Sequence, residues 1–289
     1  MTTSTVPFRL ASAWIAIACA QASFQAAAQT APTLPAATNA APPAIAAPQP
    51  GPDTAARKPP ALYNSVRTTR PVLALTFDDG PHGTLTPKLL DILRAQGVRA
   101  TFFVLGENVA LYPDIARRIV AEGHEIANHS WGHPSLPTVG AGRLDREIRD
   151  TTAIIEKTTG QKVTLLRPTY GALNDRVKKT LLEDYKIDVI MWSVDPRDWK
   201  RPGPGVVTKR LVVGAHPGAI LLVHDIHPGT IAAVPDTIAQ LKAKGYAFAT
   251  VSELLAMDDP ALSATTAPAA AAATPRPYGP SASITGGAQ

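Results

Sequence analysis

Between residues 70 and 256 the chain alternates two patterns, and this alternation limits the fold more than any other feature of the sequence. Short apolar runs rich in Val, Ile and Phe are typical of strands buried on both faces. Amphipathic segments of helical period separate these runs. Because strand and helix alternate along the chain, we expect a parallel sheet covered by helices. The predicted strands are residues 72–77, 100–105, 125–128, 163–167, 189–194, 219–224 and 247–250.

Several predicted helices are followed by glycine, which commonly occupies the left-handed position after a helix. Gly97, Gly123, Gly160 and Gly245 follow four of them. The region from 63 to 258 is long enough for one α/β domain of about seven parallel strands around a single core. The predicted helices span residues 86–96, 109–121, 143–158, 175–185, 206–213 and 234–244.

Polar side chains lie at or just after the ends of several predicted strands. In a closed (β/α) barrel the active site is built from the carboxyl ends of many strands, whereas an open sheet binds its ligand at one switch point. Because at least five strands contribute here, the sequence favours a barrel-like closure. The residues are Asp78, Asp79, His129, Arg167, Asp195, His224 and Asp225.

Two adjacent carboxylates, Asp78 and Asp79, are followed at once by Gly80 and Pro81. Side chains alternate across a strand, so both aspartates can serve one site only where the backbone leaves the strand conformation. The Gly-Pro pair allows this. The same four residues would also make a good turn with no chemical role, so the pair alone leaves both interpretations open.

His129 and His133 are four residues apart, which allows both rings to face one point. Gly132 and Pro134 favour a short irregular turn there over a helix. With the aspartate pair, these histidines supply three metal-type ligands and one spare carboxylate, the set that zinc-assisted hydrolysis needs. Without such partners, a histidine pair is more commonly structural.

Arg167, His224 and the loop from 195 to 199 each have an ordinary alternative explanation. Arg167 could bind a carboxylate through two hydrogen bonds, but arginine also forms surface salt bridges. His224 ends a hydrophobic strand, where a histidine is commonly a satisfied core residue. The loop could simply pack its indole, Trp199. Their joint occurrence at one rim favours a chemical site over these separate explanations.

Residues 1–28 have the order of a secretory signal. Arg9 precedes a short apolar stretch, and Ala26-Ala27-Ala28 offers small residues for cleavage. No segment is long and apolar enough for a transmembrane helix. We therefore expect an exported protein, periplasmic or secreted. The single cysteine, Cys19, lies in this signal, so the mature chain would have no thiolate nucleophile; lipid anchoring through Cys19 is the alternative.

Residues 29–62 and 259–289 are rich in Ala and Pro and lack apolar periodicity, so we expect a linker and a disordered tail. An extracellular scaffold whose tails bind a partner is a weaker alternative. The net charge is +5, with basic residues spread along the chain. Because no basic run contains interleaved aromatic residues, we expect no nucleic-acid partner.

Five motifs, in their order along the chain, resemble those of the polysaccharide deacetylases, which form carbohydrate esterase family four and carry the NodB homology domain. The similarity runs from about residue 71 to 255. Thr169 departs from the family, which more often has proline there. The motifs are Thr76-Phe77-Asp78-Asp79-Gly80, His129-Ser130-x-x-His133, Arg167-Pro168-x-Tyr170, Asp195-x-x-Asp198-Trp199 and Leu222-Val223-His224-Asp225.

The resemblance implies a distorted, incomplete (β/α) barrel that binds one divalent metal, usually zinc, with cobalt or nickel as alternatives. It implies Asp79, His129 and His133 as the metal ligands.

The resemblance also implies catalytic roles. Asp78 would be the general base and Arg167 would orient it. His224 would be the general acid, and Asp198 would orient or charge it.

The remaining implied roles concern the substrate. The backbone N–H of Tyr170 would help hold the oxyanion, and Leu222 and Trp199 would border the acetyl pocket. The resemblance implies an enzyme that removes N-acetyl groups from N-acetylhexosamine units of a polysaccharide by attack of metal-bound water, releasing acetate. We expect a monomer. Peptidoglycan is the favoured polymer, and chitin or chitooligosaccharide is next. An O-acetyl esterase acting on xylan and a glycan-binding pseudoenzyme are the alternatives.

Overall fold

A parallel sheet of eight strands forms the centre of residues 59–262, the part of the chain that the computed structural model describes. The strands follow the order β1-β6-β5-β4-β3-β2-β7, and β8 also pairs with β2. Strands β2 to β8 correspond to the seven predicted strands. The bounds are β1 Leu62–Tyr63, β2 Val72–Asp78, β3 Thr101–Val104, β4 Glu125–Asn128, β5 Leu165–Leu166, β6 Asp188–Ile190, β7 Ile220–His224 and β8 Ala247–Ala249.

The sheet curls into a half-barrel, and an irregular segment reaches its β7 edge. After β6, the Ser193 N–H donates to the Ile220 carbonyl at 3.0 Å, and the Leu222 N–H donates to the Val194 carbonyl at 2.9 Å. The predicted α/β architecture of parallel strands in an incomplete barrel is therefore confirmed. The eighth strand, β1, is too short to leave a pattern in the sequence, and it begins at Leu62, the last residue of the predicted linker.

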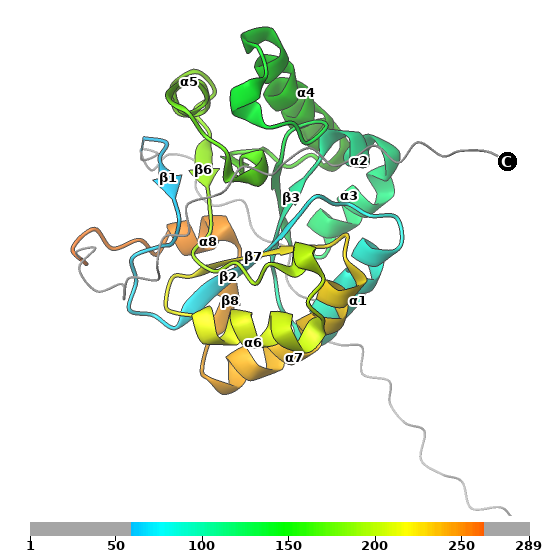
Figure 1. Ribbon diagram of the computed structural model, residues 1–289, viewed down its shortest axis with the longest axis vertical. Helices are drawn as coiled ribbons and strands as arrows, with labels where there is room; N and C mark the ends of the chain where they lie inside the picture. Colours follow the sequence, from blue (N-terminus) through cyan, green and yellow to red (C-terminus); the bar gives the residue numbers. More distant parts are fainter. Residues whose placement is uncertain (1–58, 263–289) are drawn as a thin grey trace, which may run out of the picture. The chain divides into compact units, whose positions relative to one another are not determined.

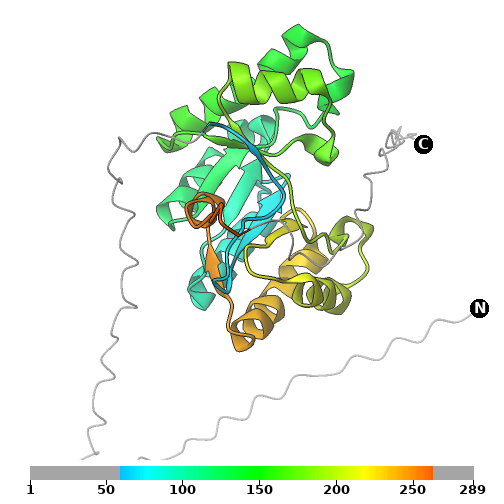
Figure 2. The ribbon, with the colours of Figure 1, turned by 90° about the vertical axis from the view of Figure 1, so that its left-hand side faces the viewer.

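Helices follow one another around the outside of the sheet. α6 packs on α7, α7 on α1, α1 on α3, and α3 on α4. In both views α4 lies at one end of this series, and α6 and α7 lie at the other (Figures 1 and 2). The bounds are α1 Leu85–Gln96, α2 Gly106–Leu111, α3 Pro113–Ala121, α4 Ala141–Thr159, α5 Asp175–Lys179, α6 Pro204–Gly214, α7 Pro228–Ala243 and α8 Val251–Leu255.

Two predicted helices are interrupted. The segment 109–121 is divided between α2 and α3, because Tyr112 precedes Pro113 and has φ −127° and ψ 57°, outside the helical region. Pro113 then begins α3, a position that proline favours. The segment 175–185 continues from α5 into a wider π-helical turn at Thr180–Asp184.

The start of one helix and the whole of another were also missed. α7 begins at Pro228, six residues before the predicted start at 234. The short helix α8 was not predicted, although Thr250 and Glu253 cap its start reciprocally.

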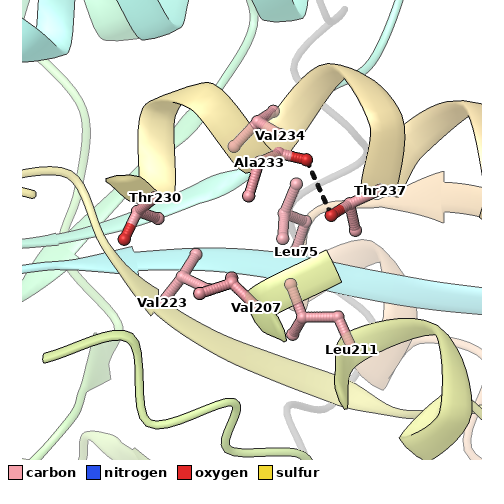
Figure 3. A pocket seen from close by; sticks show the side chains of 8 residues that line it. All are labelled: Leu75, Val207, Leu211, Val223, Thr230, Ala233, Val234 and Thr237. Atoms are coloured by element: carbon pink, nitrogen blue, oxygen red, sulfur yellow. Dashed lines mark hydrogen bonds between the residues drawn. The ribbon is translucent and has the colours of Figure 1, made fainter. Parts of the chain in front are cut away.

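The two faces of the sheet have different environments. Leu75, Phe77 and Val223 pack outward in the larger hydrophobic cluster, among residues from the surrounding helices. Figure 3 shows part of this layer, where α6 and α7 meet β2 and β7 in a gap with no room for a water molecule. The residues that alternate with these on the strands, among them Thr76 and Asp78, therefore face the concave side.

No helix among residues 59–262 is long and apolar enough to cross a bilayer. The predicted signal at 1–28, Cys19, most of the linker and nearly all of the tail lie outside the described residues.

Candidate active site

The pairing of β2 with β7 places two predicted catalytic residues side by side. In this parallel register Asp78 is opposite His224, and Thr76 is opposite Leu222. Because side chains alternate along each strand, all four occupy one face of the sheet. Asp78 is 2% exposed. The carboxyl ends of these strands therefore form one wall of a polar site.

Asp79 shows how neighbouring aspartates can serve the same site. Its φ of 75° lies in the left-handed region, which aspartate tolerates better than most residues. The side-chain amide of Asn108 donates to the Asp79 carbonyl at 2.8 Å, and the Leu105 N–H donates to the Gly80 carbonyl at 2.9 Å. These bonds hold the bend at which the chain leaves strand β2.

Asp79, His129 and His133 present three ligand atoms within 4.8 Å of one another. Asp79 Oδ1 lies 3.4 Å from His129 Nε2 and 3.2 Å from His133 Nε2. This oxygen is buried and accepts no hydrogen bond. A buried carboxylate oxygen without a donor is costly unless a cation compensates it. The site therefore fits a divalent metal with nitrogen and oxygen ligands, such as zinc.

The two histidines keep Asp79 ionised. Burial raises the pKa of this carboxyl, but the close approach of the His129 and His133 imidazoles outweighs burial and holds the pKa well below its usual range. His129 is itself oriented by its other ring nitrogen, because Nδ1 lies 2.8 Å from the Arg167 carbonyl oxygen. A bond of this kind fixes which nitrogen faces a metal.

Arg167 crosses the concave face of the sheet and is fully buried. Its Nη1 lies 2.6 Å from Asp78 Oδ1. The guanidinium also donates to the Ile190 and Met191 carbonyls at 3.2 and 3.0 Å, and it lies 4.1 Å from the centre of the Phe103 ring. Burial lowers the pKa of Arg167, while Asp78 opposes that change. One residue thus orients both Asp78 and His129.

Asp198 holds His224 through both carboxylate oxygens. Oδ1 lies 2.8 Å from His224 Nδ1, and Oδ2 accepts the His224 backbone N–H at 2.9 Å and the Thr230 hydroxyl at 2.6 Å. This geometry assigns the proton on the near side to Nδ1 and leaves Nε2 available for chemistry.

Electrostatics favour a charged His224. Burial lowers the pKa of the imidazole, but Asp198, with smaller contributions from Asp79 and Asp78, raises it to about 10. In turn, although burial raises the pKa of Asp198, bonds from His224 and Thr230 bring it below its ordinary value.

The remaining predicted residues lie around this centre. Tyr170 has φ 59°, is 40% exposed, and packs its ring edge-on to His133 at 4.5 Å between centroids. Leu222 is 4% exposed, one alternation before His224 on β7. Trp199 lies in the 3-10 turn Asp198–Lys200, next to the residue that holds His224. Nine of the ten predicted site residues thus lie at the carboxyl ends of strands or in the segments that follow them, and Leu222 lies in the middle of β7.

Asp225 is a buried carboxyl to which the sequence assigned no role. The Thr86 hydroxyl donates to its Oδ2 at 2.5 Å, while Oδ1 is buried without a hydrogen bond. Burial raises the pKa of Asp225 to about 7. Its carboxylate lies against Gly80, where an added Cβ would come within 2.2 Å of Oδ2. The only sequence signal for this contact was the position of Asp225 directly after His224.

Comparison with known proteins identifies relatives over this same region. The polysaccharide deacetylase family model matches residues 65–190. The peptidoglycan-N-acetylglucosamine deacetylase PgdA of Listeria monocytogenes is 43% identical over 182 residues, covering 63% of this chain and 38% of PgdA. A chitooligosaccharide deacetylase of Rhizobium leguminosarum bv. trifolii is 40% identical over 183 residues, covering 63% of this chain and 82% of that protein.

A solved structure agrees with the curled sheet. The peptidoglycan deacetylase PdaC of Bacillus subtilis superposes with a TM-score of 0.62 at 40% identity, covering 65% of this chain and 92% of that one. The chain thus matches almost the whole of the solved domain, while it spans about two fifths of the length of PgdA.

Proposed function

Because this chain belongs to the polysaccharide deacetylase family, we propose that it is a metal-dependent hydrolase that removes N-acetyl groups from N-acetylhexosamine units of a polysaccharide. The observation that carries the proposal is the position of Asp78 and His224 on paired strands beside the Asp79, His129 and His133 cluster. That arrangement offers a base, an acid and a cation site within one concave wall.

Asp79, His129 and His133 would hold the metal, with zinc first and cobalt or nickel as alternatives. When bound, the metal would lower the pKa of water and polarise the acetyl carbonyl. One carboxylate and two imidazoles would leave a position open for water and substrate, as catalytic zinc sites require. The unpartnered Asp79 Oδ1 supports this assignment.

Asp78 would act as the general base. Arg167 holds Oδ1, while Oδ2 lies 3.8 Å from His129 Nε2, on the side of the candidate metal ligands. A carboxylate fixed at one oxygen can take the proton of the attacking water with the other.

His224 would act as the general acid. The departing amine needs a proton, and the raised pKa keeps His224 charged at neutral pH. The backbone N–H of Tyr170 would stabilise the oxyanion, an interaction worth about 3 kcal/mol in comparable sites. Leu222 and Trp199 would enclose the acetyl methyl.

We propose two polymers, because relatives of about equal identity carry these two names. Peptidoglycan is first and chitooligosaccharide is second, because an exported protein would meet peptidoglycan first. The proposed setting is outside the cytoplasm, where a cell-wall polymer is available. The N-terminal signal and the lipid-anchor alternative remain proposals from the sequence.

Acetate release from acetylated peptidoglycan and chitooligosaccharide, with and without chelator, tests the proposal. We expect release that chelation abolishes and added zinc restores. Asp78→Asn should bind metal but lose activity by about 10²- to 10⁴-fold. Asp188→Asn is the matched control, since that aspartate lies at the amino end of β6, where its Oδ1 accepts the Ala61 N–H at 2.8 Å. Chelator-resistant release, or none from any substrate, would count against the proposal.

The xylan O-acetyl esterase alternative predicts a different role for His224. An alcohol leaving group needs less protonation than an amine. His224→Ala would therefore impair ester hydrolysis less than amide hydrolysis. Faster acetate release from acetylxylan than from both N-acetylated glycans would favour the esterase, and glycan binding without any release would favour a pseudoenzyme.

A further inference from the structure

The turn from His129 to His133 carries both histidines of the candidate metal site on strained backbone. Ser130 and His133 have positive φ values of 71° and 58°. This left-handed conformation costs a non-glycine residue about 1–2 kcal/mol. Such conformations persist only where neighbouring contacts impose them. The relative position of the two imidazoles therefore depends on what holds this turn.

Part of the support comes from the turn and its adjoining strands. The His129 N–H donates to the Val104 carbonyl of β3 at 3.0 Å. The Ser130 N–H donates to Asn128 Oδ1 at 2.7 Å, and the His133 N–H donates to Ser130 Oγ at 3.1 Å. These bonds account for both ends of the turn but not for its middle.

Glu147 of helix α4 supports the middle of the turn from outside. Its Oε2 accepts the Trp131 N–H at 2.8 Å and the Gly132 N–H at 3.0 Å. Its other oxygen accepts from Arg143 Nε at 3.2 Å, and Glu147 is 6% exposed. Hydrogen bonds to an ionised carboxylate are roughly twice as strong as neutral ones. A single buried carboxylate thus fixes two successive peptides between the histidines.

Helix α2 holds the opposite side of the same turn. The Gly106 N–H donates to the Ser130 carbonyl at 3.0 Å, and the Glu107 N–H donates to the Trp131 carbonyl at 3.2 Å. A Cβ on Gly106 would come within 2.4 Å of the Trp131 ring. Because α2 blocks movement on one side and Glu147 holds the other, the turn has little freedom to change the spacing of its histidines.

We propose that Glu147 is a positioning residue for the metal site: through Trp131 and Gly132 it sets the approach of His129 and His133, and thereby the affinity and geometry of the bound divalent ion. The inference rests on the proposed function, because it takes the two histidines as ligands. Without Glu147, the Trp131 and Gly132 N–H groups lose their acceptor, and the strained turn can relax away from the ligand geometry.

Cobalt binding to the full chain tests this role without measuring turnover. We would titrate the metal-free protein with Co²⁺, following the visible absorption of the bound ion, and measure zinc affinity by competition with a chromophoric chelator. Glu147→Ala should lower zinc affinity by about 10- to 100-fold, the usual effect of removing support from a metal-ligating histidine. The cobalt spectrum should change shape. Glu147→Gln should retain most of the affinity, since its amide oxygen can still accept both N–H groups.

Glu156→Ala is the matched control. Glu156 lies on the same helix, and its Oε1 accepts the Val163 N–H of a loop at 3.0 Å, away from the histidines. It should lose stability without loss of zinc affinity. Equal losses of affinity in the Glu147→Ala and Glu156→Ala variants would mean a general effect of damaging α4, and would overturn the inference.

A variant with a shorter acidic side chain keeps the test decisive if Glu147→Ala does not fold. Glu147→Asp preserves the charge but withdraws the carboxylate by one methylene, so it cannot reach both N–H groups in place. An unchanged cobalt spectrum and unchanged zinc affinity in this variant would overturn the inference. A wild-type chain that binds neither metal would instead refute the metal-dependent function itself, so the two failures are distinguishable.

Discussion

Asp78 and Asp79 are adjacent in the chain and yet face the same site, because they differ in backbone conformation. Asp78 is the last residue of β2, whereas Asp79 turns through a φ of 75°. Asp78 is thereby directed to Arg167, and Asp79 to the two histidines. The unlike surroundings of two identical side chains are the physical basis for the unlike roles proposed for them.

Gly80→Ala should disturb this arrangement. The added Cβ would come within 2.2 Å of the Asp225 carboxylate, so either the carboxylate or the bend at Asp79 must move. We expect a loss of about 1–3 kcal/mol in the free energy of unfolding, measured with urea. Gly205→Ala is the control, since nothing lies within 4 Å of its added Cβ.

A double-mutant cycle with Asp225→Ala checks the stated cause of that loss. If the overlap is responsible, Gly80→Ala should cost much less in the Asp225→Ala background. An equal loss of unfolding free energy in both backgrounds would show that the added methyl group destabilises the bend itself and does not act through the Asp225 carboxylate.

The ion pair of His224 with Asp198 predicts a shifted pH profile. Wild-type activity should persist into the alkaline range, because the pKa of His224 is raised to about 10 and the acid must be protonated. Asp198→Asn removes the charge chiefly responsible, so the basic limb of kcat/KM for acetate release should move to lower pH. A basic limb at the wild-type position in Asp198→Asn would argue against His224 as the acid. The control variant Asp188→Asn should leave the limb close to its wild-type position, since that carboxylate bonds the Ala61 N–H.

At the scale of elements, the parallel register of β2 with β7 brings together residues that are far apart in the chain. Asp78 and His224 are paired directly, and Arg167 reaches Asp78 from beyond β5, across β3 and β4. The sequence predicted that each of these residues ends a strand. It did not contain the strand order, which decides which strand ends are neighbours.

A buried histidine just before β4, bonded to the residue just before β3, should make the free energy of unfolding depend on pH. His124 accepts the Ala100 N–H at 3.1 Å through Nδ1 and is 3% exposed. Burial, with smaller contributions from Arg99 and Arg118, lowers its pKa from 6.5 to about 4. Between these values the unfolded chain binds a proton that the folded chain does not. The free energy of unfolding should therefore fall as the pH falls through this window, by up to about 3 kcal/mol.

Urea unfolding of the wild type and of His124→Phe at pH 7 and at pH 4.5 measures this contribution. The variant leaves the Ala100 N–H without its acceptor, so it should be less stable at pH 7. Its stability should nevertheless decline less on acidification. Parallel declines in the two proteins would place the acid sensitivity elsewhere.

For the whole molecule, the proposed metal ligands come from two turns: Asp79 follows β2, and His129 and His133 follow β4, so a bound metal would link the two turns. A ligand that binds only the folded chain stabilises it by mass action, by about 2.7 kcal/mol at a hundredfold excess over Kd. Zinc should therefore raise the Tm of the metal-free chain by roughly 5–10 °C. His133→Ala should abolish most of this shift, and an equal shift in that variant would indicate zinc binding at another place.

The sequence by itself determined the class of fold, because alternating buried strands and amphipathic helices have few stable arrangements other than a covered parallel sheet. It also determined the candidate chemistry, since the types of the site residues and their positions at the ends of predicted strands can be identified from the sequence. Its errors lay at the ends of helices and in a very short strand: the break at Tyr112, which the following proline signals, the early start of α7, and the two-residue strand β1.

Only the tertiary structure decided how those residues meet. Four features of the site depend on residues that are distant in sequence. They are the burial of the Asp79 oxygen, the bond of Arg167 to Asp78 across the sheet, the contact of Asp225 with Gly80, and the support of the histidine turn by Glu147. The physical reason is that burial and hydrogen-bond partners arise from packing, and packing depends on strand order. Local sequence patterns limit which face of a strand is buried, but they do not encode which strands are neighbours.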